Sequence, residues 1–260
     1  MSGAIPAGPV GGMLGGSAML VTAGYGISYA LARHMLRGSG ECAWELADTF
    51  FHVPFVPLVL LLVVQAVHEL CADVDARWHQ ATDETRMFLS LYVVQCSTHA
   101  VVALCLKRQV SSPAMYLAHH VVSVVCYGHA LWTGRMHFWA VLAALCEVTN
   151  IFLNNLFLFR ALKWDVSLAA VYKLNGVLLW LSYVAFRIVL FPSWLLLFAR
   201  DIHAHPGVTW YRVNTFERYA YASTTSLLLA ISAVWFAKIT SGLVTAISGA
   251  RRQVEGSKSS

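Results

Sequence analysis

Residues 115–160 read MYLAHHVVSVVCYGHALWTGRMHFWAVLAALCEVTNIFLNNLFLFR, which is two apolar runs joined by a short break at Gly134. Each run has about 20 residues, the length that an α-helix needs to cross the hydrocarbon core of a bilayer. A glycine at the break is typical of a tight turn. The stretch therefore predicts a transmembrane helical hairpin.

The whole chain has the same apolar character. Of its 260 residues, 58% are hydrophobic and only 12% are charged, and the mean hydropathy is +0.62. Soluble domains carry about 25% charged residues, so a water-soluble globule is excluded, and the high hydrophobicity excludes disorder. The net charge of +5 comes from scattered Lys and Arg, so no nucleic-acid partner is expected. The six cysteines lack CxxC spacing, and no HxxxH box precedes the histidine doublet, so we expect neither a disulfide framework nor a metal ion.

Hydropathy and helix breakers predict an all-α integral membrane protein with about seven spans. The expected spans cover residues 14–34, 50–70, 86–106, 113–133, 137–160, 166–199 and 218–247. The first span is the weakest, because glycine and polar residues interrupt it, and without it six spans remain. The sixth run is too long for one straight helix, and Pro192 predicts a kink in it or a short interfacial segment after it.

These spans divide the chain into four expected parts: a flexible lead-in (1–13), a first transmembrane helix (14–40), a six-helix domain (41–248) and a polar tail (249–260). Lys and Arg are more frequent in the connections on the side of the tail, which predicts a cytosolic C-terminus. Trp78 is expected in an interfacial loop. Trp132, Trp139, Trp194 and Trp210 are interpreted as residues of the interfacial aromatic belts.

Polar side chains inside the spans fall on shared helix faces. Tyr116 and His120 are four residues apart, and Asn150 and Asn154 follow Glu147 at i+3 and i+7. A rise of 1.5 Å per residue places His120 about 11 Å, and Asn154 about 9 Å, from the same membrane face. Ionisable groups at this depth usually face the interior of a bundle and mark functional sites. The spacing therefore predicts a His/Asn/Glu cluster that opens toward the cytosolic leaflet.

Adjacent histidines on a helix point about 100° apart, so one of His119 and His120 can face a substrate while the other supports it. A neutral imidazole can take a proton from an amine or hydroxyl, or can carry an acyl group. His119, His120 and Glu147 are therefore the candidate catalytic residues, with Glu147 orienting the imidazole. The candidate substrate-binding residues are Tyr116, Asn150, Asn154, Lys173, Asn175 and Arg187. The alternative is that such groups only form hydrogen bonds between helices, which we favour for Gln95, His99, Asn175 and Lys238.

Several of these strings resemble a known family. They are MYLAHH (115–120), CEVTNIFLNN (146–155), KLNGVLLWLSYVAFRIVLFP (173–192) and ISAVWFAKI (231–239). Together they are similar to the TLC domain of ceramide synthases and TLC-domain-containing lipid-homeostasis proteins, over about residues 44–247. The resemblance implies a barrel of helices around a lipid cavity, in the endoplasmic reticulum or a related membrane.

In ceramide synthases the histidine doublet and an acidic residue of the next helix serve acyl transfer from acyl-CoA to a sphingoid amine. The resemblance therefore implies these roles for His119, His120 and Glu147, with no bound cofactor and with acyl-CoA as a co-substrate. It also implies membrane lipids, fatty acyl-CoA and a sphingoid base as partners, and leaves a homodimer open. The family's Arg-Trp pair is replaced by Leu156 and Phe157. The alternative function is a non-catalytic protein that senses or handles lipids.

Overall fold

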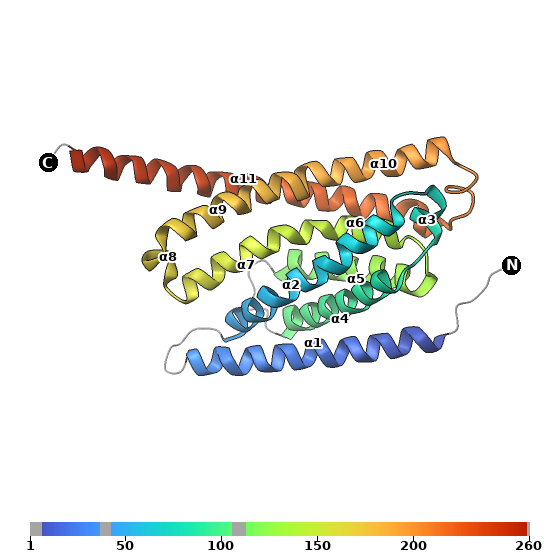
Figure 1. Cartoon of the computed structure of the whole chain (residues 1–260), viewed down its shortest axis with the longest axis horizontal. Helices are drawn as coiled ribbons and strands as arrows, with labels where there is room; N and C mark the ends of the chain where they lie inside the picture. Colours follow the sequence, from blue (N-terminus) through green and yellow to red (C-terminus); the bar gives the residue numbers. More distant parts are fainter. Residues whose placement is uncertain (1–6, 37–42, 106–112, 259–260) are drawn as a thin grey trace.

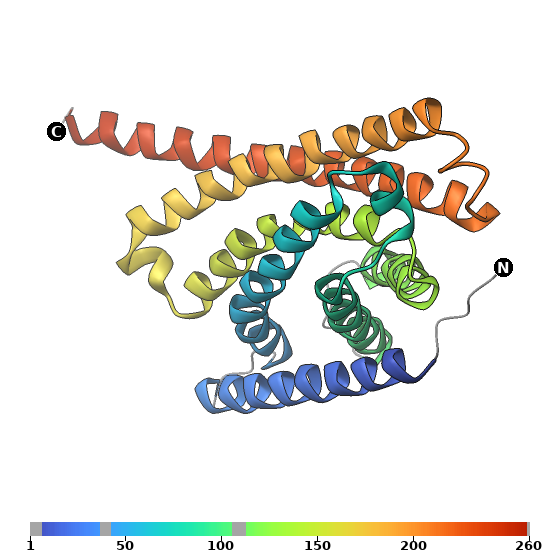
Figure 2. The ribbon, with the colours of Figure 1, turned by 45° about the vertical axis from the view of Figure 1, so that its right-hand side comes forward.

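The computed structural model describes residues 7–36, 43–105 and 113–258, and over these ranges it contains helices and no strands. Figures 1 and 2 show one bundle in which the first helix and the last helix lie on opposite sides. The all-α fold class is confirmed. In chain order the elements are α1 (Ala7–Met35), α2 (Ala43–Leu70), α3 (Val74–His79), α4 (Asp83–Cys105), α5 (Pro113–Thr133), α6 (His137–Ala144), the 3-10 turn η1 (Leu145–Glu147), α7 (Val148–Ala161), α8 (Trp164–Ser167), α9 (Ala169–Tyr183), the π-helical turn η2 (Val184–Val189), α10 (Leu190–Ala204) and α11 (Thr215–Lys258).

Five helical stretches of the described chain are long and apolar enough to cross a membrane. They cover residues 10–35, 43–70, 137–161, 169–204 and 215–245. The helices α4 and α5, with 23 and 21 residues, occupy the expected third and fourth spans and reach the necessary length, but they are not among these five. The membrane fold is therefore confirmed, whereas the count of seven spans is not.

The ends of the chain are more helical than the sequence suggested. The helix α1 begins at Ala7, inside the expected lead-in, and α11 continues to Lys258, inside the expected tail. Pro9 lies in the first turn of α1, where a proline removes an amide that has no helical partner in any case. The proline in the lead-in is therefore compatible with a helix start rather than with an irregular segment.

The helix α2 is the centre of the bundle, because it packs against α1, α4, α6 and α7. Its sequence is apolar on all sides, which is typical of a helix that is surrounded by other helices or by lipid. A row of its buried residues, spaced three or four apart, runs along the bundle axis: Val56, Val59, Val63, Ala66 and Leu70. This central position brings the first turns of α2 close to the polar groups of α4 and α5.

The predicted hairpin between α5 and α6 turns at Gly134, whose φ of 67° favours glycine. The break in the long sixth run lies just before Pro192. The π-helical turn η2 ends at Val189, and Pro192 lies in the first turn of α10. Proline has no backbone N–H, so one carbonyl in the preceding turn loses its hydrogen-bond donor. The wider π-helical turn accommodates the missing hydrogen bond. The helix then continues to Ala204 instead of giving way to a separate interfacial segment.

Three tryptophans form an aromatic core rather than an interfacial belt. Trp78, Trp139 and Trp194 are at most 1% exposed, so the belt interpretation of Trp139 and Trp194 and the loop interpretation of Trp78 are wrong. Trp194 stacks on Phe198 at 4.9 Å between ring centroids, and its indole donates to the carbonyl of Trp139. Trp132 is 72% exposed, as a lipid-facing or interfacial residue would be. Hydropathy alone does not separate these two environments.

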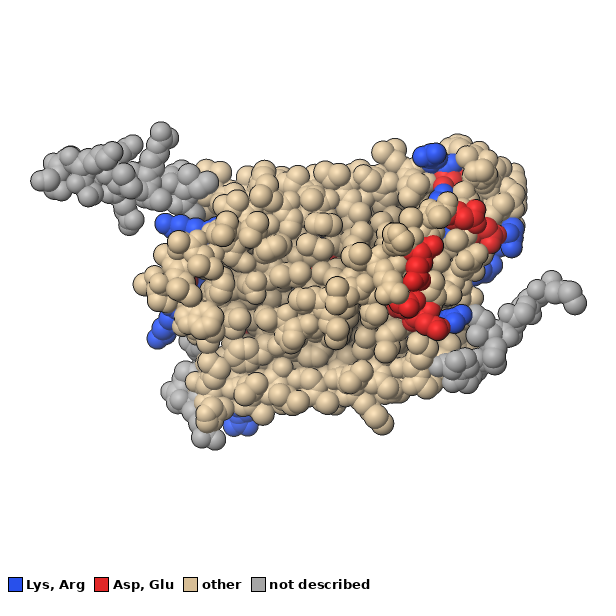
Figure 3. Space-filling model, viewed as in Figure 1, with Lys and Arg blue, Asp and Glu red and all other residues tan. Residues whose placement is uncertain are grey.

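An ion pair closes this core at the end of α10. The Asp201 carboxylate accepts from Arg77 Nε at 2.8 Å, from Arg77 Nη2 at 2.7 Å and from Trp78 Nε1 at 3.1 Å. Hydrogen bonds to Asp201 raise the pKa of Arg77. The pair ties α3 to α10. Figure 3 shows acidic side chains together with Lys and Arg at this end of the molecule, whereas the charged side chains visible at the other end are Lys and Arg.

Candidate functional site

Two irregular turns meet in the middle of the bundle, and each carries a buried charged residue. Glu147 lies in η1 and Arg187 in η2, and the two turns contact each other. Glu147 is 6% exposed and Arg187 is 8% exposed. Turns of the 3-10 and π types inside longer helices often mark functional positions. The sequence identified both residues and a kink near Pro192, but not the irregular turn η1.

Both oxygens of the Glu147 carboxylate accept hydrogen bonds. Tyr92 of α4 donates to Oε1 at 2.6 Å, and Asn150 donates to Oε2 at 2.6 Å. The bond to Asn150 matches the expected i+3 spacing on one helix face. Sequence reasoning missed Tyr92, which is a buried tyrosine in an apolar run. These two bonds orient the carboxylate, and among the described residues no hydrogen bond joins it to His119 or His120, so the expected contact of Glu147 with an imidazole is not present.

Arg187 turns toward the interior of the bundle. Its Nε donates to Thr149 Oγ1 at 3.0 Å, and its guanidinium lies 5.3 Å from the ring centroid of Tyr183. The turn that carries Arg187 packs against the turn that carries Glu147. A buried cation and a buried anion are therefore held near each other at mid-bundle, where neither charge would be stable alone.

A cavity of about 220 Å³ opens beside these turns, between α7, α9, η2 and α11. Its lining residues are Thr149, Asn150, Leu153, Leu179, Tyr183, Arg187, Trp235, Lys238 and Ile239. The walls are mostly apolar and a few polar groups converge on them, which is typical of a ligand site. Two of the predicted substrate-binding residues, Asn150 and Arg187, line it, whereas the predicted catalytic residues His119, His120 and Glu147 are not among its lining residues. Lys238, which we assigned to helix packing, lines it as well.

The two histidines of the doublet have different environments, as the 100° offset predicts. Their ring centroids are 5.1 Å apart and the ring planes differ by 78°. His120 is held at both nitrogens, because Nδ1 donates to the Tyr116 carbonyl at 2.7 Å and Nε2 lies 3.0 Å from His99 Nδ1. The charges of Arg187 and Glu147 act on His119, which is half-buried, and no described residue forms a hydrogen bond with its ring.

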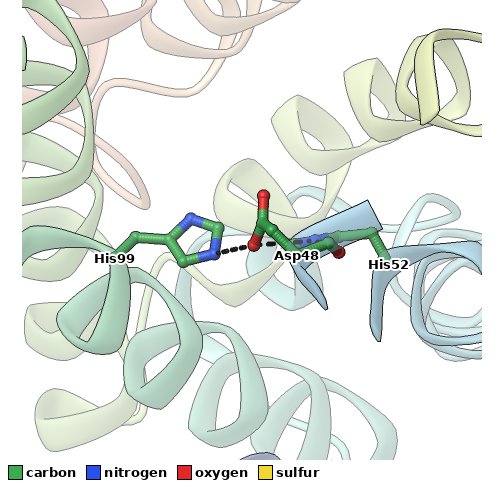
Figure 4. A group of neighbouring side chains, drawn as sticks. All are labelled: Asp48, His52 and His99. Carbon is green, nitrogen blue, oxygen red and sulfur yellow. Dashed lines mark hydrogen bonds and ion pairs between the residues drawn. The ribbon is translucent and has the colours of Figure 1, made fainter. Parts of the chain in front are cut away.

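Through His99, His120 contacts a second polar cluster. Figure 4 shows this cluster, which consists of Asp48 and His52 at the start of α2 and His99 of α4. His99 Nε2 lies 3.0 Å from Asp48 Oδ1, and His52 Nδ1 lies 3.3 Å from the same oxygen. The hydroxyl of Tyr25 donates to Asp48 Oδ1 at 2.9 Å. The ligand atoms of Asp48, His52 and His99 all lie within 4.8 Å of one another, which is close enough to hold one metal ion. The sequence analysis did not single out Asp48 or His52, although their i, i+4 spacing was an available signal.

The other predicted substrate-binding residues lie away from the cavity. Asn175 donates to the carbonyl of Phe152 at 2.8 Å and joins α9 to α7, which is the structural role favoured for it. In the described part of the chain, Lys173 is exposed on α9, Asn154 is half-buried on α7, and neither lines the cavity. Tyr116 stacks on His99 at 5.6 Å between ring centroids and belongs to the second cluster. Their roles in substrate binding stay predictions.

The comparisons with known proteins agree with this fold. The family model of the TLC domain matches residues 41–241. TLC domain-containing protein 1 of Gallus gallus is 27% identical over 184 residues, which are 69% of this chain and 71% of that protein. ASC1-like protein 3 of Oryza sativa subsp. japonica is 24% identical over 144 residues, or 50% of this chain and 49% of that protein. No solved structure matches the chain. Because the family model covers most of its length, this chain is a member of the TLC domain family, an integral membrane protein whose family is consistent with a lipid-related function.

Proposed function

We propose that this protein transfers a fatty acyl group from acyl-CoA to the amine or hydroxyl of a membrane lipid, and that His119 is the reacting group. The proposal rests on the different hydrogen bonding of the two adjacent histidine rings. The ring of His120 is bonded at both nitrogens, whereas the half-buried His119 lies in the field of the buried Glu147 and Arg187. A general base or acyl carrier needs a nitrogen that is available to substrate.

The chemistry follows from the imidazole of His119. As a base, one ring nitrogen takes the proton of the acceptor amine or hydroxyl while that group attacks the thioester carbonyl. The carbon–sulfur bond then breaks, and the CoA thiolate leaves with the proton. As an acyl carrier, the same nitrogen attacks the thioester first and the acceptor then takes the acyl group. Both routes conserve the acyl group and release one CoA thiol.

Glu147 and Arg187 act as positioning and electrostatic groups in this proposal. The opposite charges of Arg187 and Glu147 both act on His119, and Glu147 is the candidate partner of the imidazolium that forms during proton transfer. Tyr92 and Asn150 keep the carboxylate in one orientation. Arg187 and Asn150, both on the cavity wall, are the candidate donors to the substrate carbonyl or headgroup.

The cavity suggests how an amphipathic substrate binds. Leu153, Leu179 and Ile239 offer apolar surface to an acyl chain, and Arg187 and Lys238 offer two cations to a polar or anionic headgroup. A sphingoid base is the acceptor that the family resemblance favours. The excess of Lys and Arg in the sequence connections on the side of the tail supports a cytosolic C-terminus. An endoplasmic-reticulum or related membrane is part of the same proposal.

The test is product formation by purified protein in lipid nanodiscs that contain a sphingoid base, with acyl-CoA added and lipids analysed by mass spectrometry. His119→Ala should lower the rate by about 10²- to 10⁴-fold, the usual contribution of a general acid–base group. His68→Ala, which removes an exposed histidine of α2, is the matched control and should leave the rate unchanged. Glu147→Gln keeps the shape of the side chain and removes its charge, so it should lower the rate as well.

The same samples test the alternative function, which is lipid handling without catalysis. A lipid-handling protein would co-purify with an intact lipid in wild type and in His119→Ala alike, and neither would form product. That result would contradict acyl transfer. The apolar cavity with Arg187 and Lys238 on its wall is the observation that favours this second function.

A further inference from the structure

We propose that Asp48, His52 and His99 form a binding site for a divalent transition-metal ion of the zinc type. The site is separate from the cavity and does not depend on the proposed acyl transfer. It differs from our expectation of no metal ion, which rested on the cysteine spacing and on the missing histidine boxes. Those patterns could not reveal a site made by two residues of α2 and one residue of α4.

The spacing of the ligand atoms already fits a metal ion. Asp48 Oδ1 lies 3.0 Å from His99 Nε2 and 3.3 Å from His52 Nδ1. Nitrogen and oxygen ligands at about 2.0–2.1 Å from a tetrahedral zinc ion lie roughly 3.3 Å apart. Figure 4 shows both histidines directed at the carboxylate from opposite sides. Only small side-chain movements are needed to converge on one ion.

The residue types select the metal. Two imidazoles and one carboxylate suit zinc and similar transition metals, whereas magnesium and calcium prefer oxygen ligands. His52 and His99 are 6% and 4% exposed, and the Asp48 side chain is 29% exposed. The carboxylate therefore offers an ion a path into an otherwise buried site. Three protein ligands leave a fourth position open for a water molecule or another ligand.

The hydrogen-bond directions leave a lone pair on His99 Nε2 that points toward Asp48 and the hydroxyl of Tyr25. His120 Nδ1 donates to the Tyr116 carbonyl, so in the neutral ring His120 Nε2 is an acceptor. His99 Nδ1, 3.0 Å away, must then carry the hydrogen, which leaves a lone pair on Nε2 of a neutral His99. The single hydrogen of the Tyr25 hydroxyl can be donated to this lone pair or to Asp48 Oδ1, which lies 3.0 Å from His99 Nε2, but not to both. A metal ion bound by His99 Nε2 and Asp48 Oδ1 uses the lone pairs of both atoms.

Both histidines also have outer partners of the kind that metal ligands use. A metal-bound histidine normally donates its second N–H to a neighbouring acceptor. His99 does so toward His120. His52 Nε2 lies 2.6 Å from the amide of Gln95, whose Oε1 is buried without a partner among the described residues. His52 Nδ1 donates to the backbone carbonyl of Asp48 at 2.8 Å, so coordination through Nδ1 replaces this hydrogen bond and moves the ring hydrogen to Nε2. Turning the Gln95 amide then places Oε1 against the N–H on His52 Nε2.

The experiment measures metal in the full chain, purified in mild detergent with an affinity tag that contains no histidine and without chelators. Elemental mass spectrometry should find about one zinc ion per protein. Asp48→Asn and His99→Ala should each lower this content at least tenfold, and Gln95→Ala should weaken zinc affinity by about 10- to 100-fold as an outer partner. His68→Ala should keep the metal.

A second measurement needs no variant that could misfold. Wild-type protein stripped with a chelator and dialysed should take up one cobalt(II) ion and show the visible absorption of tetrahedral cobalt, and zinc should displace it. Wild type that contains no metal and binds neither ion would overturn the proposal. Equal metal content in wild type, Asp48→Asn and His99→Ala would overturn it too, because the metal would be adventitious.

Discussion

Replacing Arg77 by methionine should strongly destabilise the protein. The substitution removes both guanidinium hydrogen bonds to Asp201, whose side chain is 3% exposed. The carboxylate then keeps only the bond from Trp78 Nε1. Breaking a buried ion pair in this way leaves an uncompensated charge and costs about 3 to 5 kcal/mol in the free energy of unfolding.

The same reasoning predicts partial rescue. In the double variant Arg77→Met/Asp201→Asn the buried charge is gone, and the amide oxygen of asparagine still accepts from Trp78. This variant should recover about 1 to 3 kcal/mol relative to Arg77→Met alone, the usual size of coupling between contacting residues. The matched control is the pair of Arg212 and Asp75, which lie at 2.8 Å but are 53% and 43% exposed. Arg212→Met should cost less than about 1 kcal/mol.

The assay is thermal unfolding of the purified variants in one detergent, followed by intrinsic tryptophan fluorescence. For a chain of roughly this size, each kcal/mol shifts the midpoint by about 2 to 4 °C. Arg77→Met should therefore unfold well below Arg212→Met. Equal midpoints for these two variants, or a double variant less stable than Arg77→Met, would refute the assignment of a buried, coupled pair.

Two further predictions concern local packing. Tyr92→Phe removes a hydrogen bond to the Glu147 carboxylate and should lower stability by about 1.5 to 3 kcal/mol, the size of a bond to a charged group; an unchanged unfolding midpoint would contradict the contact. Gly24→Ala places a Cβ 2.8 Å from Phe51 Cε2 and should destabilise the contact of α1 with α2 by about 1 to 3 kcal/mol. Gly26→Ala meets nothing within 4 Å and should be neutral or stabilising, so a midpoint equal to that of Gly24→Ala would argue against this packing.

The sequence predicted the helices well, because hydrophobic runs and breakers act over a few residues. Gly134 marks the turn between α5 and α6, and the expected span 113–133 coincides with α5. The kink expected near Pro192 is present as the turn η2, whereas η1 was not predicted, because no proline or glycine marks it in the sequence. The burial of Trp139 and Trp194 was missed because an apolar residue that faces lipid and one that faces protein give the same hydropathy signal.

The candidate site was predicted in part. Helical spacing predicted the bond between Glu147 and Asn150 and the divergent directions of the doublet. Tertiary packing supplied the partners that spacing cannot give: Tyr92 on Glu147, and His99 on His120. Contacts between residues far apart in the chain depend on how the helices pack, and a single sequence does not contain that information.

The most direct test of the proposed function is the rate at which acyl-CoA releases free CoA thiol in nanodiscs that contain a sphingoid base, compared between wild type, His119→Ala and His120→Ala. The account predicts release by wild type, loss of about 10² or more in His119→Ala with the fold intact, and a smaller loss in His120→Ala, whose ring supports its neighbour. No release by wild type, or full activity of His119→Ala, would contradict the account.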